Sequence, residues 1–447
     1  MIPLWDLWER AKTGPQISER EFDLKLFKTV RSLVKTYDIT YDAETIISND
    51  ITKSVLDAAL QLIVDLGVFY IDGQRIIKVE EDEVKESLKN IPREIYVGEG
   101  KERIKLTVRN NGKVNVTGGS AGCPLSEKFY SKIMYSYAKE PRVSILGTGI
   151  LENYNGMTIE PGSPVDMAAA RTEAKLAREA AKMAGRPGLC IIGPSHIKSE
   201  ATNFASEALR TSDIYEIGQF NELKVNLETF KQILFCKTNG FVTAVSQCPL
   251  IGGYAGGPEG AAIVSVAEAL QCFTISGGMF YDFSPVNIRL SVSTDRKSLW
   301  VQSVALMSLR RIKAITGTFI YTAAGPCTED QCYEIAAQTL TNTICGAVII
   351  GGIGGAKGKH VDHYTGMEAR IVGEVSDASL KLHASDGNEI LNEILKKYEE
   401  KQKHGKINIG KSFPECYDLK TITPSQEYLN IWEKVKRELE NLGLSKL

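Results

Sequence analysis

The sequence predicts a mixed α/β fold: a closed barrel of eight parallel strands surrounded by helices, the (β/α)8 or TIM barrel, with an N-terminal helical extension and C-terminal helices. Two observations support this prediction. About eight short apolar segments alternate with helical segments, which is typical of a parallel sheet covered by helices. No candidate strand is followed by a dinucleotide-binding fingerprint, and the alternation runs without a break in composition, which favours a closed barrel over an open doubly wound sheet.

The first part of the chain is predicted to be helical. Leu26, Val30 and Leu33 follow the spacing of an amphipathic helix, and Val55 and Ala59 begin a second such pattern. We assign residues 1–95 to a helical extension that packs on the barrel.

A β-hairpin is predicted over residues 103–117. Apolar and polar residues alternate over residues 104–108 and again over 114–116. Between them, Asn111-Gly112 supplies a two-residue turn that permits positive φ. We expect this hairpin to close one mouth of the barrel.

Strand–helix units follow in residues 96–380, which we assign to the barrel domain. The best-defined helix begins at Ser163-Pro164, with Asp166 in its first turn, and ends before Gly185. Similar start signals stand at Asn226, Gly257-Pro258-Glu259, Thr294-Asp295, and Thr328 with Gln331. The candidate strands are residues 143–146, 189–192, 222–225, 241–246, 272–275, 286–290, 314–321 and 347–350.

Residues 381–447 form the third predicted part, a C-terminal helical segment. Amphipathic, lysine-rich helices are expected near residues 388–401 and 427–442. We expect them to pack outside the barrel or against a neighbouring subunit.

Composition argues against several classes of protein. A net charge of −2, with 53 basic and 55 acidic residues, gives no basic field for a nucleic acid. The chain has no run of the roughly 18 apolar residues that span a bilayer and no apolar leader, so no membrane partner and a cytoplasmic location are expected. Nine cysteines without metal-ligand or disulfide spacing indicate free thiols and no metal site.

Two glycine-rich segments follow apolar strands. Residues 351–359 do not match a phosphate loop, because Lys359 is followed by His360 rather than Ser or Thr. A flexible loop at the mouth of a barrel is the better interpretation. In residues 248–259, four glycines leave the backbone open to close approach, either in a mobile lid or in a surface for a flat macrocycle: Gly252, Gly253, Gly256 and Gly257.

Polar residues near strand ends are candidates for the site. Among the carboxylates, Glu216 and Glu368 stand out, although most acidic residues at such places are helix caps or ion-pair partners. His196, just past Gly193-Pro194, is a candidate substrate contact. His360 and His363 lack further ligands nearby, so we expect them to face solvent rather than to hold a metal.

Short motifs recur in a fixed order along nearly the whole chain. They are Gly118-Gly119, residues 124–127, 183–188, Gly193-Pro194, residues 219–224, 252–257, 285–289, 324–329, 356–358, 365–370, 373–375 and 415–418. Together they resemble the monomethylamine:corrinoid methyltransferases of methanogenic archaea. The resemblance implies a TIM barrel, a homo-oligomer of six subunits, and a cognate corrinoid protein. That partner carries the cobalamin, so none is tightly bound to this chain, and its cobalt(I) takes the methyl group of a small methylated substrate.

The catalytic cluster of the family differs here at three positions. Ile192 stands where the family has pyrrolysine, Ser246 where it has a glutamate, and Phe319 where it has a glutamine. Glu216 matches a glutamate that the family keeps near the site. Without the imine, the neutral nitrogen of a primary amine is a poor leaving group. A quaternary ammonium or sulfonium donor already carries the charge that eases departure, so it is the expected substrate.

This hypothesis gives each candidate residue a role. Glu216 supplies counter-charge as a catalytic residue, and Ile192 and Ser246 shape the floor of the site. Aromatic faces hold the cation, with His196 as a further substrate contact; the rings are those of Phe319, Tyr321 and Tyr254. The residues expected to face the corrinoid are Gly252, Gly253, Gly256, Gly257 and Met367.

Two alternatives stay open. The chain is either an active methyltransferase or a catalytically inactive relative that binds a methylated small molecule or the corrinoid protein. The intact mouth motifs at residues 252–257 and 365–370 favour the enzyme. Among enzymes, a monomethylamine methyltransferase is the alternative to a quaternary ammonium or sulfonium enzyme.

Overall fold

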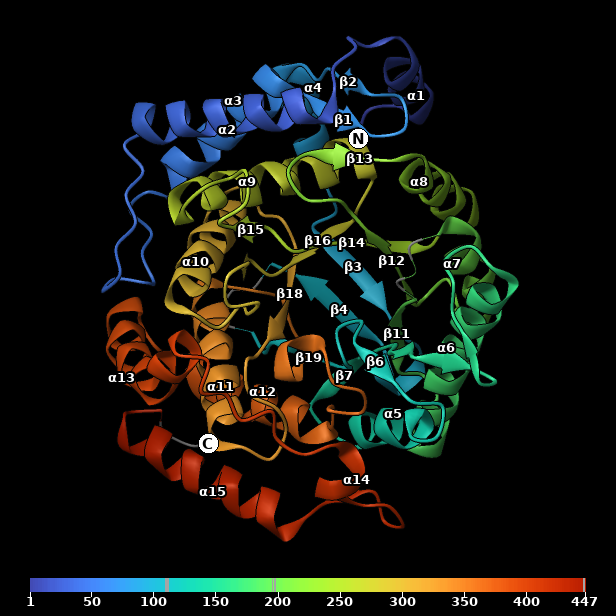
Figure 1. The fold of residues 1–447 in the computed structure, drawn as a ribbon, viewed down its shortest axis with the longest axis vertical. Helices are drawn as coiled ribbons and strands as arrows, with labels where there is room; N and C mark the ends of the chain where they lie inside the picture. Colours follow the sequence, from blue (N-terminus) through green and yellow to red (C-terminus); the bar gives the residue numbers. More distant parts are fainter. Residues whose placement is uncertain (109–111, 195, 197, 445–446) are drawn as a thin grey trace.

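Eight parallel strands close into a barrel at the centre of the molecule (Figure 1). The computed structural model describes residues 1–108, 112–194, 196, 198–444 and 447. Within these residues, the predicted (β/α)8 barrel is confirmed. In chain order its strands are β5 (Asn115–Gly118), β7 (Val143–Gly147), β11 (Cys190–Gly193), β12 (Ile214–Gly218), β14 (Val242–Gln247), β16 (Phe280–Phe283), β18 (Thr316–Tyr321) and β19 (Ile349–Gly354).

One helix follows each barrel strand and covers its outer side (Figure 1). The predicted start signals act as expected: the Ser163 hydroxyl accepts the Asp166 backbone N–H at 3.1 Å, with Pro164 at the first helical position. The helices are α5 (Tyr130–Ala138), α6 (Pro164–Met183), α7 (Ser199–Ala205), α8 (Leu227–Asn239), α9 (Pro258–Gln271), α10 (Arg296–Arg311), α11 (Glu329–Cys345) and α12 (Gly366–Ser379).

The predicted strand at residues 272–275 is wrong. These residues form a π-helical turn, Cys272–Ser276, which continues α9. The barrel strand is β16, Phe280–Phe283, after Gly277 and Gly278. The helix α9 is buried on nearly every face, and the apolar run that follows it is short. Its hydrophobic pattern therefore cannot distinguish a strand from a helix, which explains the error.

Two other predicted strands lie outside the barrel. Residues 222–225 contain only the short strand β13 (Lys224–Val225), which pairs with β1 (Val68–Tyr70). Residues 286–290 contain β17 (Val286–Asn287), which pairs with β15 (Leu250–Ile251). The fourth barrel strand is β12, which precedes the predicted segment.

The hairpin predicted over residues 103–117 is also wrong. The strand β4 (Ile104–Thr107) pairs with the preceding β3 (Glu94–Val97), whereas β5 joins the barrel. Asn111 of the expected turn lies outside the described residues. The β3–β4 hairpin nevertheless lies across one end of the barrel (Figure 1). It closes that end because Ile95, Val97 and Leu106 pack with the inward residues of the barrel strands.

Helices at both ends of the sequence pack around the barrel (Figure 1). The N-terminal elements are α1 (Leu4–Thr13), α2 (Glu19–Thr36), α3 (Thr52–Leu66), β1, β2 (Arg75–Ile77) and α4 (Glu81–Lys89), with α3 against α9 and α10. The C-terminal helices are α13 (Ala384–Lys403), α14 (Phe413–Cys416) and α15 (Gln426–Asn441), and α13 and α15 pack against α11.

Short strand pairs and 3-10 turns decorate the loops. They are β6 (Pro124–Leu125) with β8 (Ile150–Leu151), β9 (Asn153–Tyr154) with β10 (Met157–Thr158), β20 (Tyr417–Asp418) with β21 (Thr423–Pro424), and the turns Gly100–Glu102, Ser206–Ala208 and Gly355–Gly358. Among the described helices, none combines the length and the hydrophobicity that crossing a bilayer requires.

Candidate active site

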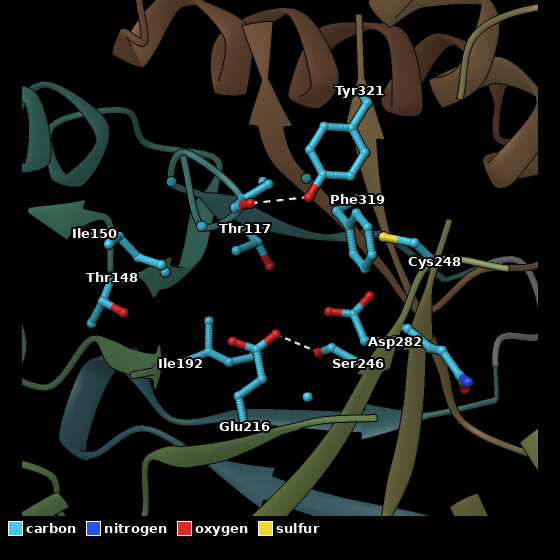
Figure 2. Close-up of a pocket in the computed structure, with 18 of the residues that line it drawn as sticks. Thr117, Thr148, Ile150, Ile192, Glu216, Ser246, Cys248, Asp282, Phe319 and Tyr321 are labelled. Carbon is cyan, nitrogen blue, oxygen red and sulfur yellow. Dashed lines mark hydrogen bonds between the residues drawn. The ribbon is translucent and has the colours of Figure 1, made fainter. Parts of the chain in front are cut away.

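A cavity of roughly 330 Å³ opens at the carboxyl ends of the barrel strands. Active sites of (β/α)8 barrels occupy this end, because the loops and side chains of several strands meet there. Five residues expected in the site line this cavity together (Figure 2): Ile192, Glu216, Ser246, Phe319 and Tyr321.

Ile192 forms part of the floor. It lies near the end of β11, paired in register with Ile214, and is 6% exposed. Its side chain belongs to the apolar cluster that includes Ile95 and Val97 of the plugging hairpin. The floor at this position is therefore hydrocarbon and offers neither a nucleophile nor an electrophile.

Two carboxyl groups lie around the Ser246 hydroxyl. Ser246 donates a hydrogen bond to Glu216 Oε1, and its register partner on the next strand is Asp282. Burial raises the pKa of the Asp282 carboxyl well above its usual range, and the charge of nearby Glu216 raises it further. Among the residues that the structure describes, the cavity lining contains Glu216 and Asp282 but no Lys, Arg or His. Its electrostatics therefore favour a cation.

Aromatic rings lie nearer the mouth than the carboxyl groups. Asp282 on β16 pairs in register with Gly317 on β18. Phe319 and Tyr321 follow Gly317 along β18, so their rings lie closer to the mouth than the Asp282 carboxyl group does (Figure 2). The two rings meet edge to face, with centroids 5.6 Å apart. The Tyr321 hydroxyl donates to the Ala121 carbonyl at 3.2 Å, which fixes that ring and leaves aromatic surface for a cation.

A thiol and two amides complete the wall. Burial raises the pKa of the Cys248 thiol to about 12, so it is neutral and unsuited to nucleophilic attack. The Gln219 amide donates to Gln247 Oε1 at 2.8 Å, and the Tyr281 hydroxyl donates to the same oxygen at 3.2 Å. This network ties the end of β14 to the loop after β12.

Sequence reasoning missed Asp282, Gln219 and Gln247. Asp282 had a usable signal: in the segment 280–283 it is the one acidic residue among three aromatic ones, and on a strand it shares the inward face with Phe280. A single acidic residue inside an apolar segment is the pattern of a barrel strand that ends in a site.

The structure does not bring His196 into this cavity. Its Nδ1 lies 2.7 Å from Asp166 Oδ1, and its Nε2 lies 2.7 Å from Glu173 Oε2, both on α6. Burial opposes its charge, yet the two carboxylates prevail and raise the pKa of His196 to about 9. Both ring nitrogens have carboxylate partners, so His196 links the end of β11 to α6. Its role as a substrate contact stays a prediction.

The glycine-rich segment lies at the mouth, but Tyr254 does not line the cavity. Glu222 Oε1 accepts the backbone N–H groups of Tyr254 and Ala255, at 2.7 and 3.3 Å, and the Tyr254 side chain is 43% exposed. Gly256 has φ +81° and open space where a Cβ would lie. A Cβ at Gly252, Gly253 or Gly257 would instead come within 3.1 Å of a side-chain atom of Ile288, Glu222 or Glu259. That these four glycines face a corrinoid stays a prediction.

Met367 and Glu368 are structural. Met367 is fully buried at the start of α12, so the structure does not place it on the surface at the mouth, where it was expected to face a corrinoid. Glu368 accepts the Thr365 backbone N–H at 2.8 Å in a capping box, and burial raises its pKa to about 8. Of the residues that the structure describes, no three or more His, Cys, Asp or Glu gather as metal ligands would.

Comparison with known proteins identifies the family. The family model "Monomethylamine methyltransferase MtmB" matches residues 2–444. The chain is 34% identical over 449 residues to monomethylamine methyltransferase MtmB of Methanosarcina mazei and to MtmB1 of Methanosarcina acetivorans, covering 98% of this chain and 98% of each relative. The crystal structure of the Methanosarcina barkeri monomethylamine methyltransferase (MtmB) superposes with a TM-score of 0.95 at 32% identity, covering 98% of both chains.

These likenesses span the whole barrel and both helical extensions. They confirm the relationship that the sequence motifs predicted and the expected class of enzyme. The chain belongs to the monomethylamine methyltransferase MtmB family.

Proposed function

We propose that this chain transfers a methyl group from a small methylated ammonium compound to the corrinoid of a separate protein, with monomethylamine as the first candidate donor. The observation that carries the proposal is the acidic, aromatic-walled cavity, with Glu216 beside Ser246 and Phe319 nearer the mouth. The names of the full-length relatives support monomethylamine over the other donors.

The depth order of the side chains supports one orientation of the donor. The carboxyl group of Glu216 lies deeper along the strands than Phe319, so the charged nitrogen points inward and the methyl group points to the mouth. When the C–N bond breaks, its electron pair stays on nitrogen. A donor that enters as a cation therefore leaves as a neutral amine, while Phe319 and Tyr321 keep water from the reacting carbon.

The residues present fit a corrinoid that approaches from outside. A cavity of roughly 330 Å³ suits a small donor but is too small for a corrin macrocycle, which would lie across the mouth. There, Gly256 leaves open space over the backbone. The corrinoid supplies the cobalt(I) nucleophile, and this chain holds the donor. A cognate corrinoid protein, and a homo-oligomer of six subunits, are parts of the same proposal.

A second candidate donor is a quaternary ammonium or a sulfonium compound. The hydrocarbon floor at Ile192 favours it, because such a donor needs positioning but no electrophile to activate its leaving group. The ring of Phe319 offers a face to a methylated cation at a gain of ~0.5 to 2 kcal/mol.

The test is methyl transfer in solution. The purified chain is mixed with the reduced corrinoid protein and, separately, with monomethylamine, tetramethylammonium, a betaine or dimethylsulfoniopropionate. We expect the cobalt(I) absorption band to give way to methyl-cobalt with monomethylamine. Transfer only from the quaternary or sulfonium donors favours the second candidate. Persistent cobalt(I) with every donor contradicts both and favours the inactive relative.

A further inference from the structure

The carboxyl group of Asp282 is a buried acceptor that the folded chain leaves incomplete. The residue is 9% exposed and lines the cavity. Its Oδ1 atom is buried and accepts no hydrogen bond from the part of the chain that the structure describes. A buried polar atom without a partner is costly, so such an atom in a cavity points to a ligand that completes it.

The barrel is shaped to hold this carboxyl group in the cavity. Gly317 pairs with Asp282 on the neighbouring strand. A Cβ atom at Gly317 would come within 2.8 Å of Asp282 Oδ1 and 3.0 Å of its Cγ. Any larger residue at 317 would therefore displace the carboxyl group. The carboxyl group of Asp282 fits here because Gly317 on β18 has no side chain.

Glu216 and Asp282 differ in the hydrogen bonds that their carboxyl oxygens accept. Glu216 Oε1 already accepts the Ser246 hydroxyl, whereas Asp282 Oδ1 has no such donor among the described residues. The charge of Glu216 attracts any cation of suitable size. The free acceptor of Asp282 is satisfied only by a ligand that carries a hydrogen-bond donor.

We infer that Asp282 contacts the substrate by accepting a hydrogen bond from an N–H group, and that it selects ammonium donors with at least one N–H over quaternary ammonium and sulfonium compounds. This inference rests on the proposed function, since it assumes that the cavity binds the methylated cation. A quaternary ammonium or a sulfonium has no N–H, so it would leave Oδ1 unpaired.

The ionisation of Asp282 is coupled to the ligand. The titratable groups around it are Glu216 on β12, the Cys248 thiol after β14, and the neighbouring Tyr281 hydroxyl. Burial and the charge of Glu216 favour the neutral carboxyl in the absence of a cation. A bound ammonium favours the ionised form, which accepts the stronger, charge-assisted hydrogen bond.

The test is calorimetric binding to the full chain without any corrinoid protein. Methylammonium and tetramethylammonium are titrated into the wild type, Asp282→Val, Asp282→Asn and Glu216→Gln. We expect the wild type to prefer methylammonium. Asp282→Val loses the acceptor, so methylammonium affinity falls roughly 10- to 100-fold and tetramethylammonium affinity changes much less. Asp282→Asn keeps an oxygen but loses the charge, so the preference falls to a smaller extent.

Glu216→Gln is the matched control. It removes a cavity carboxylate that we expect to act on charge alone, so both cations weaken together and the preference stays. An unchanged preference in Asp282→Val overturns the inference about Asp282 and leaves the proposed function standing. If that variant does not fold, an unchanged preference in Asp282→Asn overturns it equally. A wild type that prefers tetramethylammonium also overturns it, whereas a wild type that binds neither cation overturns the proposed function as well.

Discussion

Two clusters of ionisable side chains on the barrel are built in opposite ways. In one, the His196 imidazolium lies between Asp166 and Glu173 on α6, at 2.7 Å from each. In the other, Glu216 and Asp282 face a cavity in which none of the described lining residues is Lys, Arg or His. The first cluster contains its own cation, and the second opens to the cavity.

The comparison indicates that the His196 cluster stabilises the fold, whereas the carboxyl groups in the cavity are available for binding. Asp166 and Glu173 also accept the backbone N–H groups of Gly162, at 2.8 Å, and Leu151, at 2.7 Å, so the first cluster connects three segments. Such a fully partnered cluster fixes the fold. Glu216 and Asp282 instead line a cavity, where their attraction for a cation is available to a ligand.

The largest expected effect comes from breaking the His196 cluster. His196→Gln removes the cation and leaves Asp166 and Glu173 buried without compensation, so the free energy of unfolding should fall by roughly 3–5 kcal/mol. Urea denaturation measures this, and methylammonium affinity under folding conditions should be unchanged. Unaltered stability with lost methyl transfer would instead give His196 the substrate-contacting role that its sequence position suggested.

The same cluster predicts a loss of stability at alkaline pH. The folded-state pKa of His196 is raised from 6.5 to about 9, so its contribution is complete below pH 6.5 and is lost as the pH rises through about 9. That difference corresponds to roughly 3 kcal/mol. Buried Glu334 and Glu368 have pKa values raised to about 7 and about 8. They too make the folded state less stable as the pH rises, but over a lower pH range.

Comparing the wild type with His196→Gln separates the pH dependence due to His196 from that of the other groups. Unfolding free energies of the wild type and His196→Gln are measured from pH 6 to pH 10. Their difference should shrink toward alkaline pH, because Glu334 and Glu368 titrate in both proteins. A difference that is constant with pH would mean that His196 is not charged in the fold.

The carboxyl groups in the cavity predict the opposite pattern. Glu216→Gln removes the counter-charge, so kcat/KM for methyl transfer should fall about 100-fold, which is about 2.7 kcal/mol. Its free energy of unfolding should stay the same or rise, because Glu216 lines the cavity and is only partly buried, so the packed core does not depend on it. A strongly destabilised variant with normal kcat/KM would show that Glu216 serves the fold.

The smallest expected effect concerns the aromatic wall. Phe319→Leu keeps an apolar side chain but removes the ring face above the carboxyl groups. Affinity for methylammonium and tetramethylammonium should fall by the ~0.5–2 kcal/mol of a cation–π contact. Calorimetric titration of both cations measures it, and unchanged affinity for both would assign Phe319 to packing alone.

The architecture was predictable because local signals repeat along the chain. Alternating strand and helix segments predict the closed barrel, and caps such as Ser163 and Thr328 mark helix starts that the structure reproduces. The resemblance to the family predicts that Ile192, Glu216 and Phe319 share one site, and all three line the cavity. Their roles in catalysis and binding remain predictions.

What the sequence could not reveal depends on distant packing. The partners of His196 lie 23 and 30 residues away on a helix, and nothing local distinguishes a paired histidine from a substrate contact. The burial of Met367 follows from how α12 docks on the barrel. Asp282 is a different case, because its signal is local: the apolar run at residues 272–275 fits a strand better than residues 280–283 do, so the strand that carries Asp282 is not predicted.

The central claim is that the barrel cavity binds a methylated cation through its carboxyl groups. Calorimetric titration of methylammonium into the wild type and into a Glu216→Gln, Asp282→Asn double variant tests it most directly. We predict one site per chain in the wild type and an affinity at least about 100-fold lower in the double variant, with no loss of unfolding free energy. Undiminished binding by a folded double variant, or no binding by the wild type, would contradict the claim.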